Sequence, residues 1–169
     1  VSLPGPSGKA ALDMAVAGQS ITIALADEID ISRGDVLAAA DSPPGIADQF
    51  EATIVWMADS PMLPGRPYWL KSGTSTVTAT ITSEKYQISV NTMEHLAGKT
   101  LGLNAIGVCD ISLDRPLPFT PYADNHDLGG FILIDRMTNA TVGAGMLHFA
   151  LRRSHNIHWQ SIDITPSAH

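Results

Sequence analysis

Cysteine is nearly absent from this chain. Cys109 is the single one in 169 residues, so no disulfide can form within the chain. This usage suits a reducing compartment, and we expect a cytoplasmic protein with an inert, buried thiol at Cys109. Charged residues are also few, at 16%, and the net charge is −7. Because proteins that bind nucleic acids concentrate positive charge, this balance argues against broad nucleic-acid binding.

Long apolar runs are missing as well. No stretch approaches the roughly 20 residues of a membrane span, so we expect no membrane association. Residues 1–6 have neither the charged nor the apolar region of a secretory signal peptide. The chain also begins without methionine, which indicates a piece of a longer protein.

The motifs that bind nucleoside triphosphates fail in detail. In residues 5–10 (Gly-Pro-Ser-Gly-Lys-Ala) the glycines are too close together for a phosphate loop, and Ala10 cannot ligate Mg²⁺. Residues 127–130 (Asp-Leu-Gly-Gly) resemble a switch motif but lie in a turn before a hairpin. An Asn-Lys-x-Asp motif that reads guanine is absent. The sequence therefore predicts no GTPase machinery in this chain.

Short segments with β character recur instead. They are rich in Val, Ile, Thr and aromatic residues, as strands are. The predicted strands are residues 20–25, 50–57, 67–71 and 74–82. Residues 101–113 are apolar or small at every second position and predict a longer strand with one buried face. Residues 93–97 are long enough for only one helical turn.

The last forty residues contain a β-hairpin. An apolar run at 131–135 is followed by a polar turn at 137–140 and a second apolar run. Proline and glycine separate the other segments, and residues 42–45 (Ser-Pro-Pro-Gly) mark the best boundary. We predict an all-β protein in which residues 1–45 form part of one β-barrel. Residues 46–166 then form a closed, six-stranded antiparallel β-barrel.

Several short motifs occur in an order that resembles the large, GTP-binding subunit of bacterial sulfate adenylyltransferase, which in some bacteria is fused to adenylylsulfate kinase. They are residues 27–35 (Asp-Glu-Ile-Asp-Ile-Ser-Arg-Gly-Asp), 64–68 (Pro-Gly-Arg-Pro-Tyr), 103–107 (Leu-Asn-Ala-Ile-Gly), 144–146 (Ala-Gly-Met) and 156–160 (Asn-Ile-His-Trp-Gln). Two positions depart from the family pattern: His126 and Leu128 stand where the family usually has Arg and Thr.

The resemblance implies an architecture like that of elongation factor Tu, in which a GTPase domain precedes two β-barrels. Residues 1–45 would then be similar to domain 2, and residues 46–166 to domain 3. The implied parent enzyme forms adenylylsulfate and diphosphate from ATP and sulfate, coupled to GTP hydrolysis, with GTP and Mg²⁺ as cofactors. Its implied partners are the small catalytic subunit, the missing GTPase domain and, in the fused form, a kinase domain.

Arg152, Arg153 and Trp159 are the candidate interface residues. Two adjacent guanidiniums are costly to bury unpaired and should lie at a surface, where arginine offers planar donors to carboxylates. Arginine and tryptophan are also enriched at protein interfaces. The alternative is a solvated strand end with Trp159 packed on the barrel.

A group of histidines is the other candidate site. His148, His155 and His158 have a spacing seen in metal sites, but a strand or loop does not bring such residues together by spacing alone. We therefore assign no metal-binding, cofactor-binding or catalytic residue to the chain.

Three interpretations of function remain open at this stage. In the first, the chain is a non-catalytic barrel region that couples domains or docks the partner subunit. In the second, it is a translation-factor-type barrel that binds tRNA or another macromolecule, which a contiguous basic face would favour. In the third, it is a structural spacer; an exposed apolar patch would favour docking over spacing.

The missing phosphate motifs generate the first testable prediction. Titration of GTP into the isolated chain, with and without Mg²⁺, should release no heat of binding in a calorimeter. Tight Mg²⁺-dependent binding would contradict the argument, because this chain lacks the loop that cradles phosphates.

Overall fold

A computed structural model describes residues 3–4, 11–12, 14–89, 91–96 and 100–153. This part of the chain divides between Ser32 and Arg33 into two compact units, which are described separately. In the first unit, β1 (Leu3–Pro4) and β2 (Ala11–Leu12) form a short antiparallel pair. The strand predicted at residues 20–25 is wrong, since Ala24 alone makes an isolated bridge there. An extended segment becomes a strand only where a neighbour takes up its backbone hydrogen bonds along its length.

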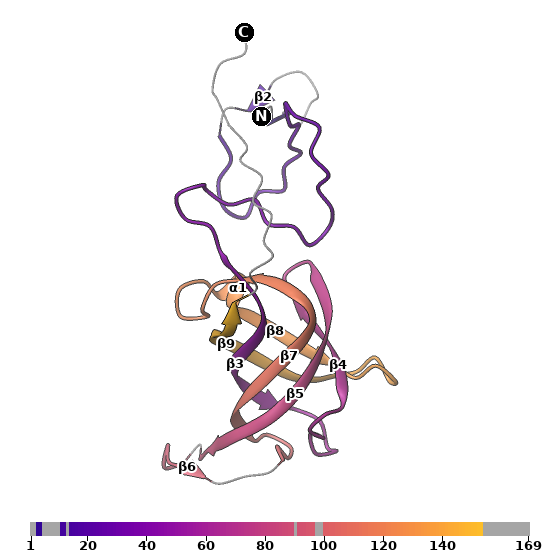
Figure 1. Cartoon of the computed structure of the whole chain (residues 1–169), viewed down its shortest axis with the longest axis vertical. Helices are drawn as coiled ribbons and strands as arrows, with labels where there is room; N and C mark the ends of the chain where they lie inside the picture. Colours follow the sequence, from indigo (N-terminus) through magenta and orange to yellow (C-terminus); the bar gives the residue numbers. More distant parts are fainter. Residues whose placement is uncertain (1–2, 5–10, 13, 90, 97–99, 154–169) are drawn as a thin grey trace. The chain divides into compact units, whose positions relative to one another are not determined.

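The second unit contains a closed antiparallel β-barrel (Figure 1). The order of strands around the ring is β4–β8–β9–β3–β7–β5, and β4 also pairs with β5, which closes the ring. The barrel strands are β3 (Gly45–Trp56), β4 (Pro67–Ser72), β5 (Ser75–Ile88), β7 (Ile106–Phe119), β8 (Gly130–Ile134) and β9 (Thr141–Arg153). The predicted closed, six-stranded barrel is therefore confirmed.

The core lies inside this ring. Along β3 the alternate residues Phe50, Ala52, Ile54 and Trp56 are buried, as the period of two in a strand requires. Phe50 packs edge-on against Phe119 of β7, with ring centroids 4.7 Å apart. Edge-to-face contact suits the charge distribution of aromatic rings, and this pair joins the neighbouring strands β3 and β7.

Two local predictions need correction. The strand predicted from residue 101 begins only at Ile106, because residues 103–104 form a turn in which Asn104 has a φ of 61°. Leu103 is consequently 50% exposed, although it fits the apolar alternation. The helical turn predicted at residues 93–97 is also wrong for its described part, since β6 (His95–Leu96) pairs with the end of β5.

The β8–β9 hairpin is confirmed, and its turn depends on one aspartate. Asp135 accepts hydrogen bonds from the backbone N–H of Met137, at 3.1 Å, and from the hydroxyl of Thr138, at 3.2 Å. Asn139 has a φ of 57°, a conformation that asparagine tolerates better than most residues. These contacts are typical turn chemistry, as the sequence predicts for this segment.

Cys109 lies on the inward face of β7 and is fully buried. Burial, together with the negative charges of Glu84 and Asp110, raises the pKa of the Cys109 thiol to about 12. Because the thiolate is the reactive species, the predicted inert thiol agrees with its surroundings.

Gly145 generates a prediction about packing. A Cβ at this position would lie 2.2 Å from Cζ of Phe131, a core residue on the neighbouring strand β8. We expect Gly145→Ala to lower the free energy of unfolding by roughly 1–3 kcal/mol through overpacking. Gly102→Ala is the matched control, since nothing lies within 4 Å of its added Cβ. Urea unfolding measures both variants, and an equal effect would contradict the packing argument.

Candidate docking surface

Two of the candidate interface residues end the last barrel strand. The backbones of Arg152 and Arg153 pair with Gln49 and Ala47 of β3. The register shifts between these two partners, so Asp48 is the extra residue of a β-bulge. Trp159 lies outside the described residues, as do His155 and His158.

The bulge residue Asp48 carries an unusual carboxylate. Its Oδ1 atom is buried and has no hydrogen-bond partner among the described residues. A buried oxygen of this kind favours a nearby donor or cation, because leaving it unpaired costs free energy. The register therefore places a carboxylate oxygen that lacks a hydrogen-bond partner next to the backbone of two arginines.

A polar network crosses the outer surface of four neighbouring strands. Lys85 Nζ on β5 lies 2.5 Å from Oε2 of Glu51 on β3 and 3.0 Å from Oδ1 of Asp110 on β7. On the other side, His148 Nδ1 on β9 lies 3.1 Å from Oε1 of Glu51. His148 Nε2 lies 2.9 Å from the hydroxyl of Thr53. We call Glu51, Lys85, Asp110 and His148 the polar ladder.

Sequence reasoning missed the polar ladder because two of its members sit in β-bulges. The pairings on either side of Lys85 and of His148 leave each without a directly opposite residue. A bulge re-aims a side chain, so strict alternation does not reveal which way it points. A lysine or histidine that interrupts an alternating strand is the signal that could have suggested a bulge.

The polar ladder shifts the pKa values of two members. Burial alone would raise the pKa of Glu51, but hydrogen bonds and positive charge from Lys85 and His148 hold it below its ordinary value. Hydrogen bonds to Glu51 and Asp110 raise the pKa of Lys85 in turn. Both shifts favour the charged forms of Glu51 and Lys85, and the ladder joins four strands through polar contacts.

The loop before β8 folds into one short helix, α1 (His126–Gly129), where the sequence suggests a turn. The side chain of Asn125 caps it by accepting hydrogen bonds from the N–H groups of Asp127 and Leu128. His126, one of the positions that depart from the family pattern, stacks on Tyr122 with ring centroids 4.4 Å apart. These contacts are structural, and none points toward phosphate binding.

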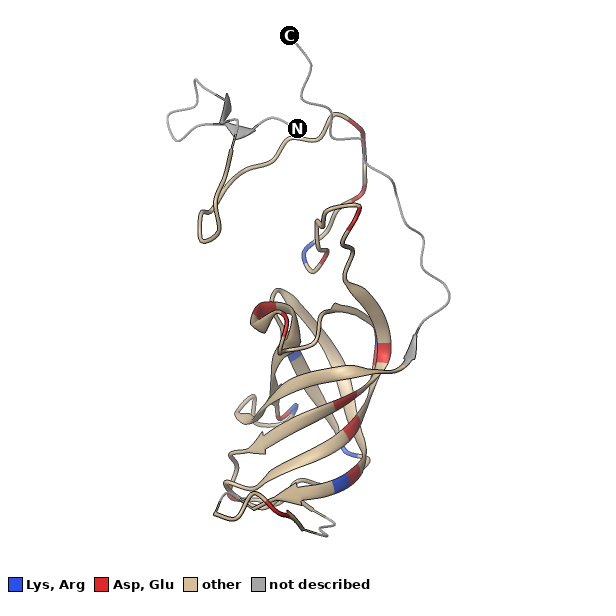
Figure 2. Cartoon of the chain, turned by 90° about the vertical axis from the view of Figure 1, so that its left-hand side faces the viewer, with Lys and Arg blue, Asp and Glu red and all other residues tan. Residues whose placement is uncertain are grey.

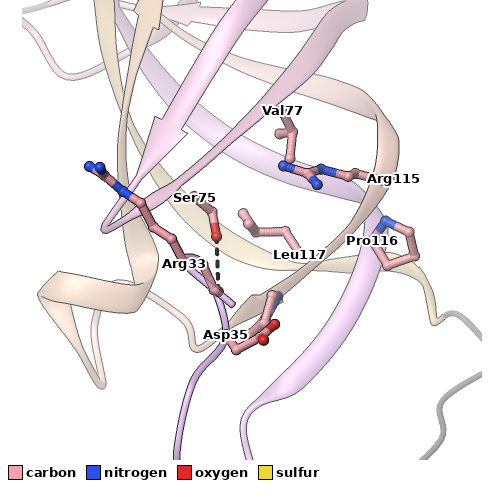
Figure 3. Close-up of a pocket in the computed structure, with 9 residues that line it drawn as sticks. Arg33, Asp35, Ser75, Val77, Arg115, Pro116 and Leu117 are labelled. Carbon is pink, nitrogen blue, oxygen red and sulfur yellow. Dashed lines mark hydrogen bonds between the residues drawn. The ribbon is translucent and has the colours of Figure 1, made fainter. Parts of the chain in front are cut away.

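A small pocket of about 120 Å³ lies between the turn at residues 33–35 and strands β5 and β7 (Figure 3). Ser75 donates a hydrogen bond to the backbone oxygen of Gly34, which fixes the turn against β5. The guanidiniums of Arg33 and Arg115 do not converge on the pocket in Figure 3, and Arg115 donates to the backbone oxygen of Thr76. The pocket therefore has no built anion site.

In the part of the chain that the structure describes, no three His, Cys, Asp or Glu residues come together as metal ligands. None of its helices has the length and apolar character needed to cross a membrane.

Acidic residues only slightly outnumber basic residues in the barrel region, by ten to eight between Gly45 and Arg153. Figure 2 shows acidic positions recurring along the strands, while basic positions are scattered. Two cations among the described residues are paired with carboxylates: Arg66, which lies 2.8 Å from Asp135, and Lys85, which contacts Glu51 and Asp110.

The barrel itself defines the class of protein. It is similar to the crystal structure of sup35 complexed with GMPPNP, with a TM-score of 0.74 over 89% of this chain and 37% of that one. At 14% identity this likeness concerns the fold, and it agrees with the predicted barrel of the translation-factor type. A family model described as GTP-eEF1A C-terminal domain-like matches residues 49–148, and the chain belongs to this family.

Curated relatives narrow the resemblance further. The chain is 52% identical, over 94% of its length, to the bifunctional enzyme CysN/CysC of Xylella fastidiosa. It is 41% identical, over 93% of its length, to sulfate adenylyltransferase subunit 1 of Aeromonas hydrophila. These matches confirm the resemblance inferred from the sequence motifs. The chain spans 25% of the first relative and 37% of the second.

The polar ladder generates a prediction about pH. Glu51→Gln should lower the free energy of unfolding by roughly 1 kcal/mol at neutral pH, because Lys85 and His148 lose their shared charged partner. A carboxylate with a lowered pKa in the folded state stabilises above its unfolded pKa, and this contribution is lost as pH falls through the folded pKa. The difference between the variant and the parent should therefore vanish in acid.

Glu94→Gln is the control for this measurement, because Glu94 is exposed and belongs to no described ion pair. Urea unfolding at a series of pH values measures both variants. A Glu51→Gln deficit that is the same at every pH would contradict the electrostatic explanation.

Proposed function

We propose that this chain is the C-terminal barrel region of a sulfate-activating enzyme. The parent protein would form adenylylsulfate and diphosphate from ATP and sulfate, coupled to GTP hydrolysis by a GTPase domain outside this chain. The observation that carries the proposal is identity of 41–52% to sulfate adenylyltransferase subunit 1 and CysN/CysC across more than nine-tenths of the chain.

Within that enzyme the barrel region is non-catalytic. Its described residues bring together no cluster of metal ligands and no phosphate-binding loop. The one hydroxyl described beside an imidazole, that of Thr53 next to His148, belongs to a residue that is only 8% exposed. GTP and Mg²⁺ belong to the missing domain. Residues 1–45 are the last part of a domain 2-like barrel, and residues 46–166 are the domain 3-like barrel.

The proposed role of the barrel is to couple the domains of the parent protein or to dock the small catalytic subunit. The name subunit 1 implies a second subunit for that relative, and the CysN/CysC name implies a fused second activity. Arg152, Arg153 and Trp159 form the proposed contact, because arginine and tryptophan are enriched at protein interfaces and two adjacent guanidiniums are costly to bury unpaired. A cytoplasmic location suits this role.

Recognition of tRNA is the weaker alternative. Binding to phosphates requires several uncommitted cations on one surface. Here Lys85 is shared between Glu51 and Asp110, and Arg66 is paired with Asp135. A spacer role is the remaining alternative, and a variant of the strand end distinguishes it from docking.

The direct test is the double variant Arg152→Ala/Arg153→Ala in the complete protein that contains this chain. We expect weaker binding of the small subunit, by about tenfold or more, since arginine is enriched among interface hot spots and a loss of about 1.4 kcal/mol is tenfold in affinity. Calorimetry measures the affinity, and the GTP-stimulated rate of adenylylsulfate formation measures coupling.

Arg33→Ala/Arg115→Ala is the matched control, because it removes the same charge from a pocket with no converging donors. Both double variants should unfold at the temperature of the parent protein. If affinity and rate are unchanged in the Arg152→Ala/Arg153→Ala protein, the strand end is only solvated and the spacer interpretation replaces docking.

A further inference from the structure

The outer surface of β4 and β8 differs from the rest of the barrel. The outward residues of β4 are Pro67, Trp69 and Lys71, because Tyr68 and Leu70 between them are buried in the core. On the β5 side they face threonines 76, 78 and 80, which is ordinary for a solvated strand. On the β8 side they face isoleucines instead.

The register fixes this apolar contact. Trp69 lies directly opposite Ile134, and Lys71 lies directly opposite Ile132. The two isoleucines flank Leu133, which is fully buried, so they point away from the core. All three apolar side chains remain partly exposed. Both faces of β8 are thus apolar, although only one of them packs inside the barrel.

Two cations border these apolar residues. Arg136 lies over the Trp69 ring, with its guanidinium carbon 4.4 Å from the ring centroid. Lys71 is exposed two residues further along β4. Neither Arg136 nor Lys71 has an ion-pair partner among the residues that the structure describes. We call Trp69, Lys71, Ile132, Ile134 and Arg136 the Trp69 patch.

The hairpin turn holds this patch in place. Asp135 accepts from Met137, Thr138 and Arg66, and so it orders the turn that carries Arg136. Met137 projects beside it and is 83% exposed. A surface that is ordered before binding loses less conformational entropy on association. Tryptophan, arginine and methionine are also the residues enriched at protein interfaces.

We propose that the Trp69 patch docks an apolar, carboxylate-bearing segment of a partner protein, and that this partner is the second subunit of the enzyme. The inference rests on the proposed function and adds a surface to it. Isoleucines 132 and 134 accept an apolar side chain, while Arg136 and Lys71 pair with carboxylates on either side of it. Because the barrel strands are paired on both edges, the segment binds through side chains and not by strand addition.

A nucleic acid fits this surface less well. A base would stack on the face of Trp69, but Arg136 already covers that ring. The phosphate backbone would need a run of cations, whereas Arg66 is paired with Asp135 and only two cations remain at the patch. The apolar centre favours a protein partner.

The test is the charge reversal Lys71→Glu/Arg136→Glu in the complete protein, titrated with its second subunit in a calorimeter. We expect affinity to fall by about tenfold or more, with the parent's own affinity declining as salt rises. Arg33→Glu/Arg115→Glu carries the same charge change elsewhere and should leave affinity within about twofold of the parent. Thermal unfolding verifies that both variants fold.

An unchanged affinity in the Lys71→Glu/Arg136→Glu protein overturns the patch. If Arg152→Ala/Arg153→Ala still weakens binding in the same titration, the proposed function survives and only the patch fails. If neither changes binding, docking by the barrel fails as well. Two further outcomes reject the proposal: binding of labelled bulk tRNA that the charge reversal abolishes, or a dimer of the chain in sedimentation that it abolishes.

Discussion

The pairing of β4 with two neighbours is the constraint on which the rest of the structure depends. β4 bonds to β5 on one side and to β8 on the other, and this double pairing converts a sheet into a ring. A ring leaves no strand edge for aggregation or for a partner's strand. Recognition by this barrel must therefore use outward side chains or strand ends, and the inward side chains are committed to the core.

The outward side chains divide into two chemically different regions. Over β9, β3, β7 and β5, the polar ladder satisfies its own charges through contacts such as Lys85 with Glu51 and Asp110. Over β4 and β8, isoleucines lie beside Trp69, and their bordering cations have no described ion-pair partner. A surface that pairs its charges internally has little to offer a partner, whereas the second region retains both apolar area and charge. This contrast, more than net charge, is why we propose contact through the second region.

Much of the fold could be predicted from the sequence, because apolar residues at every second position show which side of a strand faces the core. The β8–β9 hairpin and the strand at Phe50 follow from it directly. Prediction failed where the neighbouring strands decide whether a segment forms a strand. Residues 20–25 have the pattern of a strand but make only one bridge. Leu103 fits the apolar alternation, yet it lies in a turn. The polar ladder could not be predicted, since Lys85 and His148 reach it only through bulges. The Trp69 patch could not be predicted either, because it depends on which residues of β4 and β8 lie opposite each other, and no local sequence pattern contains that register.

Asp135 shows how one residue can serve both the fold and the surface. Hydrogen bonding to the Met137 N–H, with the positive charge of Arg66, outweighs desolvation and lowers the pKa of its carboxyl group. The same contacts that end β8 and reverse the chain also carry Arg136 to the face of Trp69. Loss of the Asp135 carboxylate would therefore loosen the turn and release Arg66 at once.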